Sequence, residues 1–422
     1  MKLKKLLCFT LAAILLLACL SGCRNSQSTD PEQTDPKPES TDPKAEKPAP
    51  EPPVQAELLS AVLSAKNLGL TVFDNQLVEY LKRTGRSDEN FTVSPLSFKA
   101  ALALAAIGAE GETRDQLLSA LGFADLDELG RWYDSVLDGV DRFERFFGGY
   151  GGAAAYQVVN SVWSNRDLSG EFRPAYLDAA GRSLRAEAFS EHGAELADAV
   201  NRWVNEKTKG LIPKLLKDAS DVSAILVNAL YLKTRWDADF AKLGDADFTT
   251  RSGEVVQKPF MQQESHFSYY EDAATQLVRV PLQGGIDMVF ILGDDTDLAE
   301  KLSKAEYRLV DVTVPMFDVE TSLDKHELCD FLRLMGCGRM FSEDAEFDPM
   351  YTAPLFVGDI IQKAKVHVDE EGLEAAAATA VLLCGAAPFE PETPAVFRAD
   401  RPFSFCVLSG NTELLFWGQI VE

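Results

Sequence analysis

Basic residues are scarce in this chain relative to acidic ones. Its 422 residues include 41 Lys and Arg against 66 Asp and Glu, which gives a formal net charge of -25 at pH 7. A protein that binds nucleic acid nonspecifically needs a basic surface to neutralise phosphates, and this composition does not supply one. The charge balance therefore excludes nonspecific nucleic-acid binding, and it favours solubility.

Motifs of the common metal and catalytic sites are also missing. The chain has no HExxH pattern and no CxxC pair, so we expect no metal and no other cofactor. Ser94 stands in no GxSxG frame and has no evident His partner, which argues against a nucleophilic serine. The glycines of residues 148–152 are not followed by Lys-Ser or Lys-Thr, so they predict a flexible loop and not a phosphate-binding loop. The histidines are far apart in the sequence: His192, His266, His326 and His367.

A run of about 20 apolar residues, which a membrane-spanning helix needs, is lacking as well. The apolar run near the N-terminus is shorter, follows a basic start and ends at Leu20-Ser21-Gly22-Cys23. This tetrapeptide resembles a bacterial lipobox, so residues 1–22 are predicted to be a lipoprotein signal peptide outside the fold, cleaved before Cys23. Lipidation of the Cys23 thiol implies an extracytoplasmic protein anchored to the bacterial cell membrane. An ordinary signal peptide followed by an incidental cysteine is the alternative.

The composition changes again after this leader. Residues 23–54 are dominated by Pro, Ser, Thr and charged residues and cannot bury a core, so we expect a lipid-anchored, semi-extended acidic linker. Residues 55–422 are expected to form one domain, although chain length alone would suggest two or three. We interpret the cysteines of this domain as free thiols, with a disulfide left open as the alternative: Cys329, Cys337, Cys384 and Cys406.

Residues 366–396 combine an acidic step, which is the three consecutive acidic residues 369–371, with a glycine, an alanine-rich run and a proline-rich end. Alanine favours helix, but Gly372 permits a bend, and the β-branched Thr379 and Val381 favour a strand or an exposed loop. Residues 385–388 predict an exposed tip that is suited to proteolysis. With period two, alternate residues form a face that could enter a sheet: Leu373, Ala375, Ala377, Thr379, Val381 and Leu383.

The acidic step and the alanine run together are similar to the hinge of inhibitory serpins. The residues that carry this resemblance are consecutive: Glu370, Glu371, Gly372, Leu373, Glu374, Ala375, Ala376, Ala377, Ala378 and Thr379. Further stretches within residues 58–422 resemble the family in order and spacing, namely 90–97, 199–216, 224–236, 312–317, 341–347, 397–403 and 415–418. The chain is therefore identified as a member of this family.

The resemblance implies an α+β serpin fold, with helices packed around three β-sheets and an exposed reactive loop. It implies a suicide inhibitor of serine proteases and not an enzyme. In such inhibitors a protease attacks the loop, forms an acyl-enzyme and is trapped when the loop inserts into the central sheet. The resemblance also implies a set of residues that governs sheet opening, with the tryptophan placed where insertion begins: Ser94, Ser97, Asn228, Gln362 and Trp236. An ordinary core aromatic is the alternative for Trp236.

The family pattern also suggests where the loop is cut. Counting from Glu370 places the reactive bond between Ala386 and Ala387, with Cys384-Gly385 or Ala387-Pro388 as alternatives. A small residue at this position suits elastase-like or subtilisin-like serine proteases. Lys and Arg are absent from residues 373–393, which disfavours trypsin-like targets. We expect the inhibitor to be a monomer.

Two residues depart from the family pattern. Leu373 stands where most inhibitory members have Thr, so it can be buried but has to be held exposed or partly inserted beforehand. Gln362 stands where the family usually has a His, so an amide must make the hydrogen bonds instead of an imidazole. The alternatives are a non-inhibitory serpin that is cleaved as a substrate and a surface lipoprotein that acts as a binding module.

Overall fold

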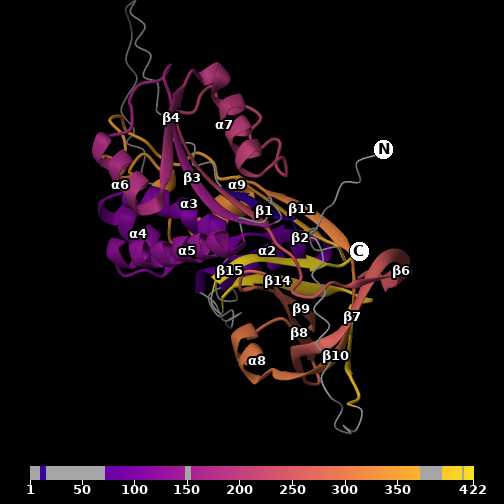
Figure 1. Ribbon diagram of the computed structural model, residues 1–422. Coiled ribbons are helices and arrows are strands. Elements are labelled where there is room, and N and C mark those ends of the chain that lie inside the picture. The colour runs from indigo at the N-terminus through magenta and orange to yellow at the C-terminus, as the bar shows by residue number, and fades with distance from the viewer. Residues whose placement is uncertain (1–9, 16–71, 148–153, 371–391, 411–412) are drawn as a thin grey trace, which may run out of the picture.

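The structure is a computed structural model of the chain (Figure 1) and describes residues 10–15, 72–147, 154–370, 392–410 and 413–422. Several predicted features lie outside the described residues: Cys23, the linker 23–54, the glycine-rich loop 148–152, the hinge beyond Glu370, Cys384 and the reactive bond between Ala386 and Ala387.

Helices and strands are intermixed along the chain, which confirms the α+β class. The helices are α2 (Val72–Arg83), α3 (Pro95–Ile107), α4 (Gly111–Leu121), α5 (Leu126–Phe147), α6 (Pro174–Leu184), α7 (Gly193–Lys207), α8 (Leu298–Lys304) and α9 (Lys325–Leu334). The strands are β1 (Thr10–Leu15), β2 (Phe91–Val93), β3 (Ala155–Asn165), β4 (Ala186–Glu191), β5 (Ala224–Lys233), β6 (Ala241–Thr249), β7 (Val255–Glu271), β8 (Thr275–Leu282), β9 (Ile286–Gly293), β10 (Glu306–Pro315), β11 (Phe317–Leu323), β12 (Gln362–Val368), β13 (Ala395–Arg398), β14 (Phe403–Ser409) and β15 (Glu413–Ile420). Within the described ranges, no helix has the length and apolar character needed to cross a membrane.

Strand β5 lies in the middle of a six-stranded sheet with the order β11-β12-β1-β5-β3-β4. The continuous apolar run of the sequence predicts a buried strand here, and residues 224–232 are buried. Its alternate side chains serve opposite faces of the sheet. Ile225 and Val227 share a cluster with residues of α7, whereas Leu226 and Leu230 belong to the larger core that contains α3. The sheet is thus enclosed between α7 and α3 (Figure 1).

Strand β1 lies between β5 and β12 and is antiparallel to both, and we call this place the central strand position. The two ends of β1 pair with Asn228 and Gln362, and with Lys233 and His367. The sequence predicts that the leader lies outside the fold, whereas the structure holds this part of it in the sheet. An extended apolar segment can do so because it satisfies the main-chain groups of both neighbouring strands. Removal of the leader stays a prediction.

The long strand β7 joins the second, nine-stranded sheet. Its first part pairs with β6, its middle with β10 and its last residues with β8. Two of the three sheets that the family resemblance implies are therefore hydrogen-bonded into one, because a single strand runs through both. Residues 241–293 supply the successive strands β6 to β9 of this sheet.

Helix α3 begins at Pro95, with Ser94 as its N-cap residue. Ser94 Oγ accepts the backbone N–H of Ser97 at 3.3 Å, and Pro95 occupies the first turn. The cap satisfies one of the backbone donors that a helix start leaves unpaired, and proline is tolerated there because its missing N–H is not needed. The local sequence alone therefore sets the start of this helix.

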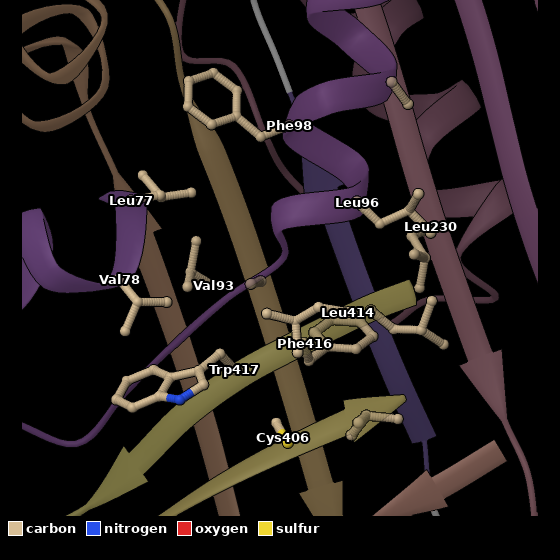
Figure 2. Close-up of a cluster of buried hydrophobic side chains, with 14 of the residues drawn as sticks. Leu77, Val78, Val93, Leu96, Phe98, Leu230, Cys406, Leu414, Phe416 and Trp417 are labelled. Atoms are coloured by element: carbon tan, nitrogen blue, oxygen red, sulfur yellow. The ribbon is translucent and has the colours of Figure 1, made fainter. Parts of the chain in front are cut away.

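The core below the central strand position is built on α3. Figure 2 shows Leu96 of α3 and Leu230 of β5 gathered with Leu414 and Phe416 of β15. Residues 95–106 of the helix are all buried, which is typical of a helix enclosed on every side. Helix α3 is therefore enclosed in the core and packs against the strands of the six-stranded sheet.

The cysteines of the described residues contribute packing and not chemistry. Cys329, Cys337 and Cys406 are buried free thiols, as the sequence predicts. Burial raises the pKa of the Cys329 and Cys337 thiols to about 12. A thiol with such a high pKa is a poor nucleophile at neutral pH.

Candidate functional site

Four of the predicted sheet-opening residues meet beneath the central strand position. Ser94 and Ser97 lie at the start of α3, Asn228 lies in β5, and Gln362 is the first residue of β12. All four are fully buried. Residues that are far apart in the sequence thus form one polar cluster inside an apolar core.

Asn228 is the centre of this cluster. The Ser97 hydroxyl donates to Asn228 Oδ1, and Asn228 Nδ2 donates to Asn160 Oδ1 at 2.9 Å. Asn160 lies directly opposite Asn228 on β3, and its own Nδ2 donates to the Tyr133 hydroxyl at 2.7 Å. Both ends of the Asn228 amide are therefore satisfied, as a polar side chain in a buried strand requires.

Gln362 joins the cluster through the main chain. Its Nε2 donates to the Ser94 carbonyl oxygen at 2.9 Å, so the amide holds β12 to the start of α3. Its Oε1 is buried, and the described residues offer this atom no hydrogen-bond partner. An unsatisfied buried acceptor costs about 1–3 kcal/mol. Gln362 therefore holds β12 less firmly than a fully bonded side chain would.

Trp236 lies apart from this cluster, beyond the other end of the central strand position. Its Nε1 donates to the Asp369 carbonyl oxygen at 3.0 Å, which joins the chain after β5 to the chain after β12. Lys242 Nζ of β6 lies 2.7 Å from Glu370 Oε1. Partial burial opposes ionisation of Glu370, but the contact with Lys242 outweighs it and lowers the pKa of this carboxyl. The start of the hinge is thus held by a main-chain contact at Asp369 and a side-chain contact at Glu370.

His367 adds ionic contacts at the end of β12, next to the start of the hinge. Its Nδ1 lies 3.6 Å from Asp318 Oδ2 on β11, and its Nε2 lies 3.4 Å from Asp369 Oδ2. Asp318 and Asp369 outweigh the effect of burial and raise the pKa of His367 to about 9, so the ring is protonated at neutral pH. The interaction with His367 in turn lowers the pKa of Asp318. Lys365, whose Nζ lies 3.3 Å from Asp318 Oδ2, also lowers this pKa.

Three residues of this site escape the sequence analysis: Asn160, Tyr133 and His367. A polar residue inside an apolar strand pattern is the one signal that could have found Asn160. Local signals are lacking for the contact of Tyr133 with Asn160 and for the contact of His367 with Asp318, because these partners lie on other elements of the fold. The structure therefore extends the predicted cluster toward α5 and adds a charged contact at the hinge.

Known proteins share the sequence pattern of this chain. The family model described as "Serpin (serine protease inhibitor)" matches residues 69–422. This chain belongs to the serpin family. A rice protein, Serpin-ZXA (Oryza sativa subsp. japonica), is 32% identical to this serpin over 374 residues, covering 80% of this chain and 91% of its own. Leukocyte elastase inhibitor of Sus scrofa is 28% identical over 78% of this chain and 92% of its own.

Solved serpin structures share the fold. Serpin48 of the insect Tenebrio molitor is 25% identical with a TM-score of 0.67, covering 87% of this chain and 98% of its own. The thermophilic serpin Tengpin, solved in its native state, is 22% identical with a TM-score of 0.67, covering 90% of this chain and 97% of its own. These likenesses confirm the serpin fold that the hinge and its accompanying motifs predict.

Replacing Asn228 by Ala should destabilise the native serpin, because Ser97 and Asn160 each lose a buried hydrogen-bond partner. An unpaired buried group costs about 1–3 kcal/mol, so we expect a lower thermal midpoint and faster spontaneous conversion to an inserted or aggregated form. Asn205→Ala, at an exposed position of α7, is the control and should change stability by no more than about 0.5 kcal/mol. Equal midpoints for the two variants would contradict the role given to the cluster.

The charge on His367 predicts that stability falls at alkaline pH. The folded pKa of about 9 lies above the ordinary value of 6.5, so protonation stabilises the fold fully below about pH 6.5. This contribution is lost as the pH rises through 9. Between about pH 7 and pH 9.5, the thermal midpoint of the unmodified serpin should therefore drop more than that of His367→Gln. Equal drops in the two proteins would show that the ring does not carry this charge.

Proposed function

We propose that this serpin inhibits elastase-like or subtilisin-like serine proteases by trapping them as acyl-enzymes. The observation that carries the proposal is the central strand position, which accepts a strand antiparallel to both β5 and β12. A loop that leaves β12 and reverses its direction enters this position with the same orientation. Strand β12 ends at Val368 and the hinge begins at Glu370. The loop is therefore attached to the end of the strand beside which it would insert.

Insertion gains free energy from apolar burial and from new hydrogen bonds. Burying Leu373, Val381 and Leu383 contributes on the order of 1.5–3 kcal/mol each, and each new ladder hydrogen bond contributes about 1 kcal/mol. Ordering each loop residue costs roughly 1–2 kcal/mol, so insertion wins only if the inserted side chains are small or apolar and the sheet opens at low cost. The alanines of the hinge meet the first condition, and the cluster around Asn228 sets the second.

The loop sequence supports the proposed class of protease. A bond between Ala386 and Ala387 offers a small residue to the protease, and residues 373–393 contain no Lys or Arg. Leukocyte elastase inhibitors of Sus scrofa and Bos taurus are 28% and 29% identical to this serpin, which also supports an elastase-like target.

We place the inhibitor outside the cytoplasm as a lipid-anchored monomer. The lipobox-like end of the leader supports lipidation at Cys23, and the linker 23–54 would lift the domain off the membrane. Once the leader is removed, the main-chain groups of β5 and β12 that pair with β1 need another partner.

A covalent complex is the direct test of this proposal. Incubation with an elastase or a subtilisin should give a serpin–protease complex that survives boiling in detergent, with cleavage after Ala386. A protease inactivated at its catalytic serine is the control and should give none. Clean loop cleavage without a complex would show a non-inhibitory, substrate-type serpin. An uncut loop would favour the binding module.

Thr379→Arg should convert inhibition into substrate turnover. Thr379 lies on the loop face assigned to the sheet interior, so an arginine there brings a charge into a buried site and stalls insertion. Ala380→Arg, on the opposite face, is the matched control and should still trap the protease. The readout is the ratio of complex to cleaved serpin on a denaturing gel. Unchanged trapping by Thr379→Arg would count against the assigned face.

A further inference from the structure

Tyr307 is an exposed aromatic residue on strand β10. Its side chain is 75% exposed, the highest value among the exposed large apolar residues of the described part of the chain. Val396, on the neighbouring strand β13, is 58% exposed. Single exposed apolar residues are ordinary on protein surfaces, so the surroundings of Tyr307 decide whether it has a role.

A chain of contacts holds the Tyr307 ring and ends beside the reactive loop. The ring centroid lies 5.8 Å from that of His266 on β7, and His266 Nε2 lies 3.2 Å from Glu392 Oε2. The other carboxylate oxygen of Glu392 accepts the backbone N–H of Leu309 at 3.1 Å. This hydrogen bond lowers the pKa of the Glu392 carboxyl. An aromatic side chain supported in this way loses little entropy on binding, which suits it to anchor an interface.

The strand register places these residues on one surface. Buried Val310 and Val312 point to the core, so the residues that alternate with them face outward. Leu309 pairs with His266, and Asp311 pairs with Val396. We call the resulting area the Tyr307 surface, and it consists of Tyr307, Leu309, Asp311, His266, Glu392 and Val396.

The short segment between the reactive bond and Glu392 brings a bound protease near this surface. Glu392 follows Ala386 by six residues, and an extended chain spans at most about 3.6 Å per residue. The reactive bond therefore lies within about 22 Å of Glu392. A serine protease domain is a body about 40 Å across, so a protease that holds this bond in its active site faces the surface around Glu392.

We infer that the Tyr307 surface binds the body of the target protease while the reactive loop occupies the active site. The inference rests on the proposed function and adds a second contact to it. The carboxylates of Asp311, Glu264 and Glu392 lie on the same face as the ring. The surface therefore fits an apolar spot with a neutral or basic rim, next to the cleft that binds residues after the cleaved bond.

Tyr307→Ser should lower the second-order rate constant of inhibition at least fivefold. Trapping is irreversible, so a shorter-lived encounter leaves less time for attack on the loop, and the measured rate falls in proportion. The stoichiometry of inhibition should not change, because loop insertion after cleavage determines it. The matched control is Phe146→Ser, which removes a 61% exposed aromatic side chain from α5, away from β10 (Figure 1), and should keep the unmodified rate.

Glu392→Gln provides a second, milder variant. It keeps an acceptor for the Leu309 N–H but removes the charge that faces His266, so the support of the Tyr307 ring weakens. We expect a two- to threefold decrease in rate, again at unchanged stoichiometry. Decreases in both variants, with none in Phe146→Ser, support the inference.

Other outcomes separate the inference from the proposed function. An unmodified rate for Tyr307→Ser overturns the docking surface and leaves the inhibitor proposal intact. A slower rate with a raised stoichiometry also overturns it, because the effect would then lie in the loop or its insertion. Self-association that Tyr307→Ser abolishes would assign the surface to a second copy. A complex formed by none of these proteins refutes the proposed function and, with it, the inference.

Discussion

The central strand position is the constraint on which the rest of the site depends. Strands β5 and β12 each present a row of N–H and C=O groups to it, and both rows need a partner. An extended segment with small or apolar side chains satisfies the two rows at once. Strand β1 pairs with both neighbours along its whole length, so a six-residue segment of this chain fits the place. The occupant of this position therefore completes the hydrogen bonding of the strands on both sides of it.

The polar cluster below this position makes separation of β5 from β12 cost free energy. The bond from Ser97 to Asn228 holds β5 to α3, and the bond from Gln362 to Ser94 holds β12 to the same helix start. Moving the two strands apart strains one of these bonds, and an apolar core offers no water to replace it. The bond from Asn228 to Asn160 carries the network on to β3. Because one oxygen of Gln362 lacks a partner among the described residues, the cost is smaller on the β12 side.

The two ends of the reactive loop are fixed to the body of the serpin by different contacts. At the start, Trp236 holds the main chain of Asp369, while Lys242 and His367 add ion pairs to Glu370 and Asp369. At the far end, Glu392 is fixed by a main-chain hydrogen bond and by a histidine. The hinge thus leaves the sheet from a defined point, and the return of the loop lies next to an exposed aromatic surface. Under the proposed function, anchoring both ends limits the region that a bound protease can occupy.

Local sequence patterns predict much of the fold and part of the site. The start of α3 follows from Ser94-Pro95 and the burial of β5 from its apolar run, because both depend on residues within a few positions of one another. The serpin resemblance of the hinge also depends on a short, continuous stretch. The merging of two sheets through β7 depends on strand pairing, which periodicity does not reveal.

The sequence by itself determined the start of α3 and the buried strand β5, and its family resemblance named most of the polar residues that are candidates for the site. Only the tertiary structure decided their partners: Asn228 bonds to residues 131 and 68 positions away, and Trp236 to one 133 positions away. The charge on His367 depends in part on Asp318 of the neighbouring strand, besides the nearby Asp369. The physical reason is that a periodic pattern specifies which face of an element is buried, whereas strand register and packing specify which atoms meet there.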